Sequence, residues 1–349
     1  MRTVAYNLIV AFAVVAVLCG VRQRRTVPVA WSLAAALAAL LAATVADTNT
    51  FGVMRLASFA VFVHAPIAAA GVAVLLRRDR PATATVAAVL ALSVVAIGID
   101  AFLIEPRSLE VTHVALSSAK LDAPLRIAVV SDIQMDDFTD YERRALSDAM
   151  AQHPDVVLLS GDYIQAASPA DAERIRESFR EYLRKIDFHA PLGVYAVQGN
   201  VEDESRWPDI FSGLPVTVFP ASATVTRDGV AVTGLTLGDS FNRAITIPGD
   251  ARFHIVLGHG PDFSLGAVDA DLLVAGHTHG GQVRLPFIGS LITLSAVPRS
   301  RAAGVTDLGG GRTLVVSRGV GMERGPAPRL RFLCRPELVV VDVRPEPRR

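Results

Sequence analysis

This sequence of 349 residues has few cysteines and few charged side chains, and neither charge is in excess. The two cysteines, Cys19 in an apolar stretch and Cys334 near the C-terminus, exclude a disulfide framework. Lys and Arg together number 34, as do Asp and Glu, so there is no sign of a nucleic-acid partner, and nothing indicates a protein partner. Charged residues make up 19% and hydrophobic residues 51%, which predicts an apolar excess concentrated in one part of the chain.

Several catalytic motifs are missing as well. The sequence contains neither a G-x-S-x-G elbow nor a recognisable Cys/His pair, so no protein nucleophile is expected. The glycines Gly309, Gly310 and Gly311 lack the lysine of a phosphate-binding loop. We expect these glycines to form a hairpin turn.

The apolar excess lies at the N-terminus, in four segments that run over residues 4–21, 29–46, 53–76 and 82–104. Each segment has about the 20 residues that a helix needs to cross the hydrocarbon core of a membrane. The alternative, buried helices of a soluble protein, does not explain why such segments recur four times. We therefore predict an all-α bundle of four transmembrane helices over residues 1–106 and a separate domain over residues 107–349.

The loops between these segments predict the orientation of the chain. Arg22, Arg24 and Arg25 follow the first segment and Arg77, Arg78 and Arg80 follow the third, whereas residues 47–50 after the second carry no positive charge. Because basic loops stay in the cytoplasm, four crossings place the domain that follows on the extracytoplasmic side of the cytoplasmic membrane.

Beyond Pro106 the sequence has the pattern of an α/β domain. Short apolar runs predict buried strands, and the stretches between the first three predict helices over residues 141–152 and 169–186. The five predicted strands cover residues 125–130, 155–160, 193–198, 253–257 and 271–275.

Each predicted strand is followed by polar side chains that suit metal ions. Taken singly, such a residue is more often a turn former or a cap. Taken together, and with glycines beside most of them, they predict one metal site at the carboxyl edge of the sheet, because divalent cations bind carboxylate, amide and imidazole groups. The residues are Asp132, Asp162, Asn200, His259, His277 and His279.

The order of these residues resembles that of the calcineurin-like metallophosphoesterase family, over most of residues 123–345. The longer strings at residues 276–282, 317–321 and 334–337 are similar to a branch of membrane-associated bacterial phosphodiesterases. The resemblance implies a four-layer α-β-β-α sandwich and two divalent metal ions, which are manganese, iron, zinc or magnesium.

The resemblance also implies roles for the residues. Asp162 bridges the two metals, Asp132 and His279 hold the first, and Asn200, His259 and His277 hold the second. Gln134 stands where the family usually has a histidine ligand, which makes the first motif D-x-Q. Its amide oxygen still coordinates but suits zinc less well, so manganese is favoured. The residues expected to act in catalysis are Asp162, Asn200 and His259.

A second departure concerns proton transfer. Val201 stands where the family has the histidine of G-N-H, which helps to protonate the leaving oxygen. A missing general acid costs about 10² to 10⁴ in rate. Residues 202–204 are acidic and are an alternative donor, although we favour an exposed acidic loop. Arg318 is either a clamp for substrate phosphate or an exposed surface arginine.

These features predict a membrane-anchored, metal-dependent phosphoesterase. It hydrolyses a phosphodiester or diphosphate bond with a metal-activated hydroxide, on a phosphorylated small molecule or a lipid-linked substrate. A leaving phosphate needs no protonation, so the residues Gln134 and Val201 favour a diphosphate bond or an activated diester. The alternative is a catalytically impaired membrane sensor or binding protein that has lost its activity.

Overall fold

The computed structural model describes residues 2–23, 43, 49–202 and 205–346 of the chain. The chain divides into two compact units, and each is described by itself. The first unit comprises Met1–Ile104 with the short segment Glu323–Arg329, and the second comprises Glu105–Met322 with Leu330–Arg349.

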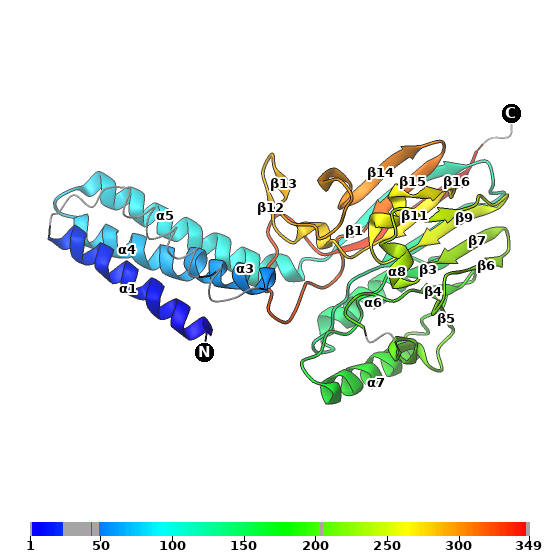
Figure 1. Ribbon diagram of the computed structural model, residues 1–349, viewed down its shortest axis with the longest axis horizontal. Coiled ribbons are helices and arrows are strands. Elements are labelled where there is room, and N and C mark those ends of the chain that lie inside the picture. The colour runs from blue at the N-terminus through cyan, green and yellow to red at the C-terminus, as the bar shows by residue number, and fades with distance from the viewer. Residues whose placement is uncertain (1, 24–42, 44–48, 203–204, 347–349) are drawn as a thin grey trace. The chain divides into compact units, whose positions relative to one another are not determined.

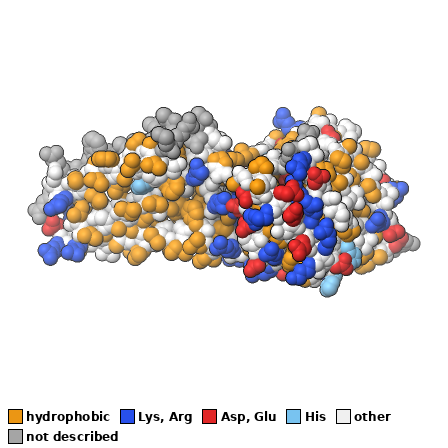
Figure 2. Space-filling view, turned by 90° about the horizontal axis from the view of Figure 1, so that it is seen from below, with side chains coloured by type: hydrophobic (Ala, Val, Ile, Leu, Met, Phe, Trp, Pro, Cys, Tyr) orange, Lys and Arg blue, Asp and Glu red, His pale blue; other side chains and the backbone are white. Residues whose placement is uncertain are grey.

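The first unit is helical (Figure 1), and its helices are apolar. Three of its helical stretches are long and apolar enough to cross a membrane, and they match the first, third and fourth predicted segments: Thr3–Arg22, Thr50–Leu76 and Pro81–Arg107. The second predicted segment, residues 29–46, lies outside the described residues except for Ala43. Figure 2 shows hydrophobic side chains spread over the face of this unit that is in view, as expected for helices that meet lipid. The elements are α1 (Arg2–Arg22), α3 (Thr50–Phe59), η1 (Ala60–His64), α4 (Ala65–Leu76), α5 (Pro81–Ile99) and η2 (Asp100–Ile104).

The helices of the first unit are joined by a few specific contacts. The His64 Nε2 atom lies 2.8 Å from Asn7 Oδ1, which links η1 to α1. The rings of Phe62 and Phe102 meet edge to face with centroids 5.3 Å apart. Gly71 of α4 lets Leu18 of α1 approach, because a Cβ atom at this position would lie only 2.7 Å from the leucine side chain.

The second unit contains two six-stranded mixed sheets. In the first sheet β2, β3, β4 and β5 are parallel, while β16 runs antiparallel to β2 and parallel to β1. In order across that sheet, the strands are β1 (Glu110–Ser118), β16 (Glu337–Pro345), β2 (Leu125–Val130), β3 (Val156–Leu159), β4 (Val194–Ala196) and β5 (Val216–Val218).

In the second sheet β15, β11, β9 and β7 are parallel, and an antiparallel strand closes each edge. The order is β14 (Gly304–Gly309), β15 (Arg312–Val316), β11 (Leu272–Ala275), β9 (Phe253–Leu257), β7 (Val230–Gly234) and β6 (Ala223–Arg227). The turn between β14 and β15 contains Gly310 and Gly311, which confirms the predicted hairpin turn.

The two sheets share one apolar core. Alternate residues of the first sheet, such as Ile127 and Leu158, pack with residues of the second, such as Ile255 and Val274. The opposite face of the first sheet packs against helices α6 (Asp140–Ala151) and α7 (Pro169–Lys185). The opposite face of the second sheet is covered by loops and by the short helices α8 (Leu237–Ser240) and η5 (Pro261–Leu265).

Local sequence signals explain where α6 and α7 begin. Thr139 and Glu142 form a capping box at the start of α6, and Ser168 caps α7 directly before Pro169. Along α7 the buried residues Ile175, Phe179 and Leu183 recur every four positions, so one face turns to the sheet.

The prediction of an α/β domain is confirmed, and all five predicted strands are present within one or two residues of their expected ends. The remaining short elements are η3 (Glu105–Arg107), η4 (Trp207–Phe211), β8 (Thr246–Ile247), β10 (Ala267–Val268), η6 (His279–Gly281), β12 (Arg284–Leu285), β13 (Gly289–Ser290) and η7 (Arg299–Arg301).

Candidate metal centre

The fold brings the loops after five parallel strands to one place. Strands β2, β3 and β4 lie side by side in the first sheet, and β9 pairs with β11 in the second. Parallel neighbours end at the same edge, and the shared core holds the two sheets face to face. The loops at these carboxyl ends carry all seven predicted ligands: Asp132, Gln134, Asp162, Asn200, His259, His277 and His279.

Several of these residues have a backbone conformation that L-amino acids rarely adopt. Positive φ values cost about 1–2 kcal/mol per non-glycine residue, so the surrounding structure must hold them. Neighbouring glycines make room, because a Cβ atom on Gly276 would overlap Ser131 and one on Gly199 would overlap Asp162. Backbone strain of this kind concentrates at functional sites. The residues and their φ angles are Asp132 (50°), Gln134 (45°), Asp162 (55°), His277 (67°) and His279 (48°).

The contacts of His259 test whether the site suits a cation. Its Nδ1 atom lies 2.9 Å from the Ser160 carbonyl oxygen, which only accepts, so Nδ1 carries the proton. Burial lowers the pKa of His259 to about 4, which leaves the ring neutral and a lone pair on Nε2 at neutral pH. That Nε2 atom faces Asn200 Oδ1 at 2.9 Å and Asp162 Oδ1 at 3.4 Å. Three acceptor atoms therefore converge, and a divalent cation held by these residues would satisfy all three.

Asp162 is the central residue of the cluster. Its Oδ1 atom accepts a hydrogen bond from the Val201 N–H at 3.0 Å, and its Oδ2 atom accepts one from Gln134 Nε2 at 3.2 Å. Ligand atoms of Asp162, Asp132 and His259 lie within 4.8 Å of one another, and all three residues are buried. Burial raises the pKa of Asp162 to about 6 in the metal-free protein.

Asp132, in the loop after β2, binds the loop after β11 of the second sheet. Both of its carboxylate oxygens accept from the His277 backbone N–H, at 2.9 and 3.1 Å, and Ser131 donates a short hydrogen bond to Oδ2. Burial and the nearby charge of Asp162 raise the pKa of Asp132 well above its usual range. Two buried carboxylates held this close favour a site that binds cations.

The remaining histidines complete the cluster. The His279 Nε2 atom lies 3.8 Å from Asp132 Oδ1. The rings of His277 and His259 have centroids 5.0 Å apart, and His277 Nε2 lies 3.2 Å from the Leu294 carbonyl oxygen. Burial, with the neighbouring His259, lowers the pKa of His277 to about 4. Each of the seven predicted ligands thus contacts at least one other, so the structure brings the whole set together.

Proton competition at these carboxylates predicts how metal binding depends on pH. Below about pH 6 the Asp162 carboxylate takes up a proton that a metal ion must displace, whereas His259 and His277 stay neutral down to about pH 4. We expect the dissociation constant for Mn²⁺ to be at least about tenfold higher at pH 5 than at pH 7. Calorimetric titration of the full chain in detergent at both pH values measures this. Equal affinity at the two values would contradict the assignment of Asp162 as a ligand.

Sequence reasoning misplaced Glu202, which is not part of an exposed acidic loop. Its carboxylate accepts hydrogen bonds from the backbone N–H groups of Asp162 at 3.1 Å, Gly199 at 2.7 Å and Ile164 at 3.4 Å, and Tyr163 donates a further short one. Burial and the charge of Asp162 raise its pKa to about 8. Glu202 therefore ties together the two loops that carry Asp162 and Asn200. The other two acidic residues of this run, at 203 and 204, lie outside the described residues.

Arg318 is not a free surface arginine. Its guanidinium group forms ion pairs with Glu110 at 2.8 Å and Glu337 at 3.0 Å. It therefore links the start of β1 to the start of β16.

A pocket of about 400 Å³ lies beside the cluster. Val201 connects the two, because its N–H donates to Asp162 and it also lines the pocket. The cationic side chains of Arg176 and Arg206 and the buried Trp207 line the same pocket. It therefore adjoins the loop that carries Asn200, Val201 and Glu202.

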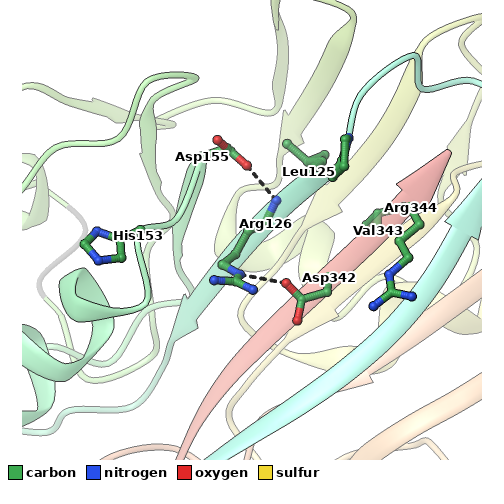
Figure 3. A pocket seen from close by; sticks show the side chains of 8 residues that line it. Leu125, Arg126, His153, Asp155, Asp342, Val343 and Arg344 are labelled. Carbon is green, nitrogen blue, oxygen red and sulfur yellow. Dashed lines mark hydrogen bonds and ion pairs between the residues drawn. The ribbon is translucent and has the colours of Figure 1, made fainter.

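A second pocket, of about 310 Å³, lies at the opposite ends of the strands. Figure 3 shows Arg126 between Asp155 and Asp342, with His153 and Arg344 nearby. The Arg126 Nε atom donates to Asp342 Oδ1 at 2.7 Å, and the Arg126 backbone N–H donates to Asp155 Oδ2 at 2.8 Å. These groups stabilise the starts of β2 and β3, away from the candidate metal centre.

Comparison with known proteins now identifies the family. The profile described as calcineurin-like phosphoesterase matches residues 125–281, a range that contains all seven clustered side chains. The second unit belongs to the calcineurin-like phosphoesterase family. The chain is therefore a phosphoesterase, a hydrolase that acts on phosphoric esters.

Curated relatives of this phosphoesterase come from several bacteria. The uncharacterized metallophosphoesterase YkuE of Bacillus subtilis (strain 168) is 27% identical over 263 residues, which covers 69% of this chain and 87% of YkuE. The phosphodiesterase YaeI of Escherichia coli (strain K12) is 29% identical over 237 residues, which covers 63% and 83%. Among solved structures, the Escherichia coli phosphoesterase YfcE is 17% identical with a TM-score of 0.31, covering 59% of this chain and 85% of YfcE.

Proposed function

We propose that this phosphoesterase is a membrane-anchored hydrolase of phosphodiester or diphosphate bonds that uses two divalent cations. The observation that carries the proposal is the position of His259 Nε2, which lies 2.9 Å from Asn200 Oδ1 and 3.4 Å from Asp162 Oδ1. A hydrogen-bonded Nδ1 on the far side of the His259 ring is the usual support for a metal-ligating histidine.

The seven clustered residues divide between the two cations. In this assignment Asp132, Gln134 and His279 would hold one cation, Asn200, His259 and His277 would hold the other, and Asp162 would serve both. Bound divalent cations lower the pKa of a water molecule and stabilise negative charge on phosphoryl oxygens. The donor set mixes carboxylate and amide oxygens with imidazole nitrogens, which favours manganese.

The protein side chains next to the cluster bear on the leaving group. Val201 cannot transfer a proton, and the Glu202 carboxylate already accepts hydrogen bonds from four backbone N–H groups. Val201 therefore offers no proton to a departing alkoxide, and the Glu202 carboxyl group is engaged in holding the two loops together. A departing phosphate or aryl oxide needs no such help, which supports a diphosphate bond or an activated diester as the bond that is cut.

Hydrolysis rates on matched substrates test this proposal. The full chain in detergent, with Mn²⁺, is assayed on a dialkyl phosphodiester, an aryl phosphodiester and a nucleoside diphosphate derivative. We expect the aryl and diphosphate bonds to be cut at least about 100-fold faster than the dialkyl bond, because only the latter requires a general acid. A clear preference for the dialkyl ester would refute the leaving-group argument.

The side of the membrane is a further part of the proposal. We infer from the basic loops that the chain crosses the membrane four times and that the second unit lies outside the cytoplasm. The substrate proposed there is a phosphorylated small molecule or a lipid-linked phosphate. The three long apolar helices support membrane attachment. Protease added to intact spheroplasts should cleave the second unit, and its protection there would reverse the orientation.

A further inference from the structure

A hairpin near the candidate metal centre exposes large apolar side chains. We call residues 284–294 the apolar hairpin; it contains β12, β13 and the segment that follows. Phe287 is fully exposed, Ile288 is 58% exposed, and Leu291 and Leu294 are 40% and 55% exposed. Single exposed apolar residues are common, but four within eight positions form a patch. Such patches mark surfaces that contact a partner or a membrane.

The charges around the apolar hairpin indicate what it contacts. Residues 283–301 include three arginines, at 284, 299 and 301, and no aspartate or glutamate. Arg299 is exposed, and Arg284 and Arg301 are half-buried. An apolar tip between basic side chains fits the interface of a membrane, where acyl chains lie below anionic headgroups.

The apolar hairpin is fixed to the loop that carries two of the proposed metal ligands. The Leu294 carbonyl oxygen lies 3.2 Å from His277 Nε2, and Ser290 Oγ donates to the Gly280 carbonyl oxygen at 2.6 Å. Next to it, Asp262 accepts hydrogen bonds from Ser295 Oγ and the Ala296 N–H. A surface that touches the hairpin is therefore held at a defined place relative to the site.

We propose that the apolar hairpin inserts into the interface of the membrane that anchors this chain, so that the metal centre works on phosphate groups carried by lipids. This inference rests on the membrane anchoring in the proposed function. The second unit begins at Glu105, and a long apolar helical stretch ends at Arg107, so the bilayer stays within reach of the tethered unit. A short apolar insertion becomes effective at such high local concentration, and side chains at the tip reach about 5–10 Å into the interface.

Quenching by brominated lipid tests the insertion without any need for turnover. The full chain carrying Phe287→Trp is reconstituted in vesicles of phosphatidylcholine and phosphatidylglycerol, with or without bromine on the acyl chains. Val305→Trp is the matched control, because Val305 is a 50% exposed apolar residue on β14 of the same unit. The unsubstituted protein gives the background from Trp31 and Trp207.

After subtraction of that background, we expect brominated acyl chains to reduce the emission that the Phe287→Trp substitution adds and to leave the emission that Val305→Trp adds unchanged. Emission that responds only to aqueous iodide, as in the control, would overturn the insertion. So would a blue-shifted emission that neither quencher reaches, because another protein surface would then cover the hairpin.

A paired assay connects the hairpin to the substrate class. The double variant Phe287→Ser, Ile288→Ser should retain hydrolysis of a water-soluble aryl phosphodiester but lose most hydrolysis of a lipid diphosphate in the same vesicles. An equal loss on both substrates would show that the substitutions damage the site itself, and no loss on either would overturn the lipid-borne substrate. If the unsubstituted chain cuts neither substrate, the proposed function fails while the quenching result still decides the insertion.

Discussion

Replacing Asp162 by asparagine should reduce Mn²⁺-dependent hydrolysis of an aryl phosphodiester by more than about 100-fold. Loss of a residue that merely supports a ligand costs about 10- to 100-fold in metal affinity or activity, and Asp162 is proposed to contact both cations. The substitution exchanges a carboxylate for a neutral amide of the same size. The Asp162 carboxylate also accepts hydrogen bonds from Gln134 and from the Val201 N–H, so the loop that carries Asn200 loses a charged acceptor as well.

Asp155→Asn is the control for this substitution, because Asp155 lies at the other end of the same strand. There its carboxylate accepts a hydrogen bond from the Arg126 backbone N–H at 2.8 Å, far from the candidate metal centre. We expect that variant to keep its activity, with thermal unfolding measured for both. If the unsubstituted chain and Asp162→Asn are equally inert with Mn²⁺ present, the catalytically impaired binding protein becomes the better description.

The positions of the proposed ligands could be predicted because they follow from a rule about parallel sheets. Asp132, Asp162 and Asn200 each come a few residues after an apolar run, and adjacent parallel strands end at one edge. The order of strands was not needed for this. The pattern of apolar runs does not show which strand pairs with which. The edge strands β1 and β6 and the antiparallel position of β16 were therefore known only from the structure.

The role of Glu202 could not be predicted, because its partners are distant in the sequence. It reaches backbone N–H groups at Asp162 and Ile164, which lie 40 and 38 positions away, as well as Gly199 nearby. An acidic run after a strand is usually solvated, and only the tertiary contact turns this carboxylate inward. The same reason applies to Arg318, whose partner Glu110 lies 208 positions earlier.

The backbone strain at the site also has no signature in composition. Positive φ angles favour glycine and, among other residues, asparagine, aspartate and histidine, yet Gln134 adopts one here. Glycine would fit the backbone better at this position, but it could not donate the hydrogen bond that Gln134 Nε2 makes to Asp162. A contact at the site, rather than local backbone preference, therefore accounts for this residue.

Replacing Val201 by histidine should speed the hydrolysis of esters that have poor leaving groups. Val201 lies directly after Asn200, its N–H donates to Asp162, and its side chain lines the adjoining pocket. An imidazole there is placed to donate a proton to a departing oxygen, a contribution of about 10² to 10⁴ in rate. We expect Val201→His to raise kcat on a dialkyl phosphodiester by about 100-fold and to change kcat on a diphosphate bond little.

The control for this gain is Val201→Gln, which adds a polar side chain of similar length that cannot transfer a proton. If both variants accelerate the dialkyl ester equally, polarity or access to the pocket explains the effect. If only histidine does, and the gain falls above the pKa of the new imidazole as that ring loses its proton, then a missing general acid limits this enzyme. If the described residues supply no such acid and the seven proposed ligands bind metal, the site is suited to bonds whose leaving group departs as an anion.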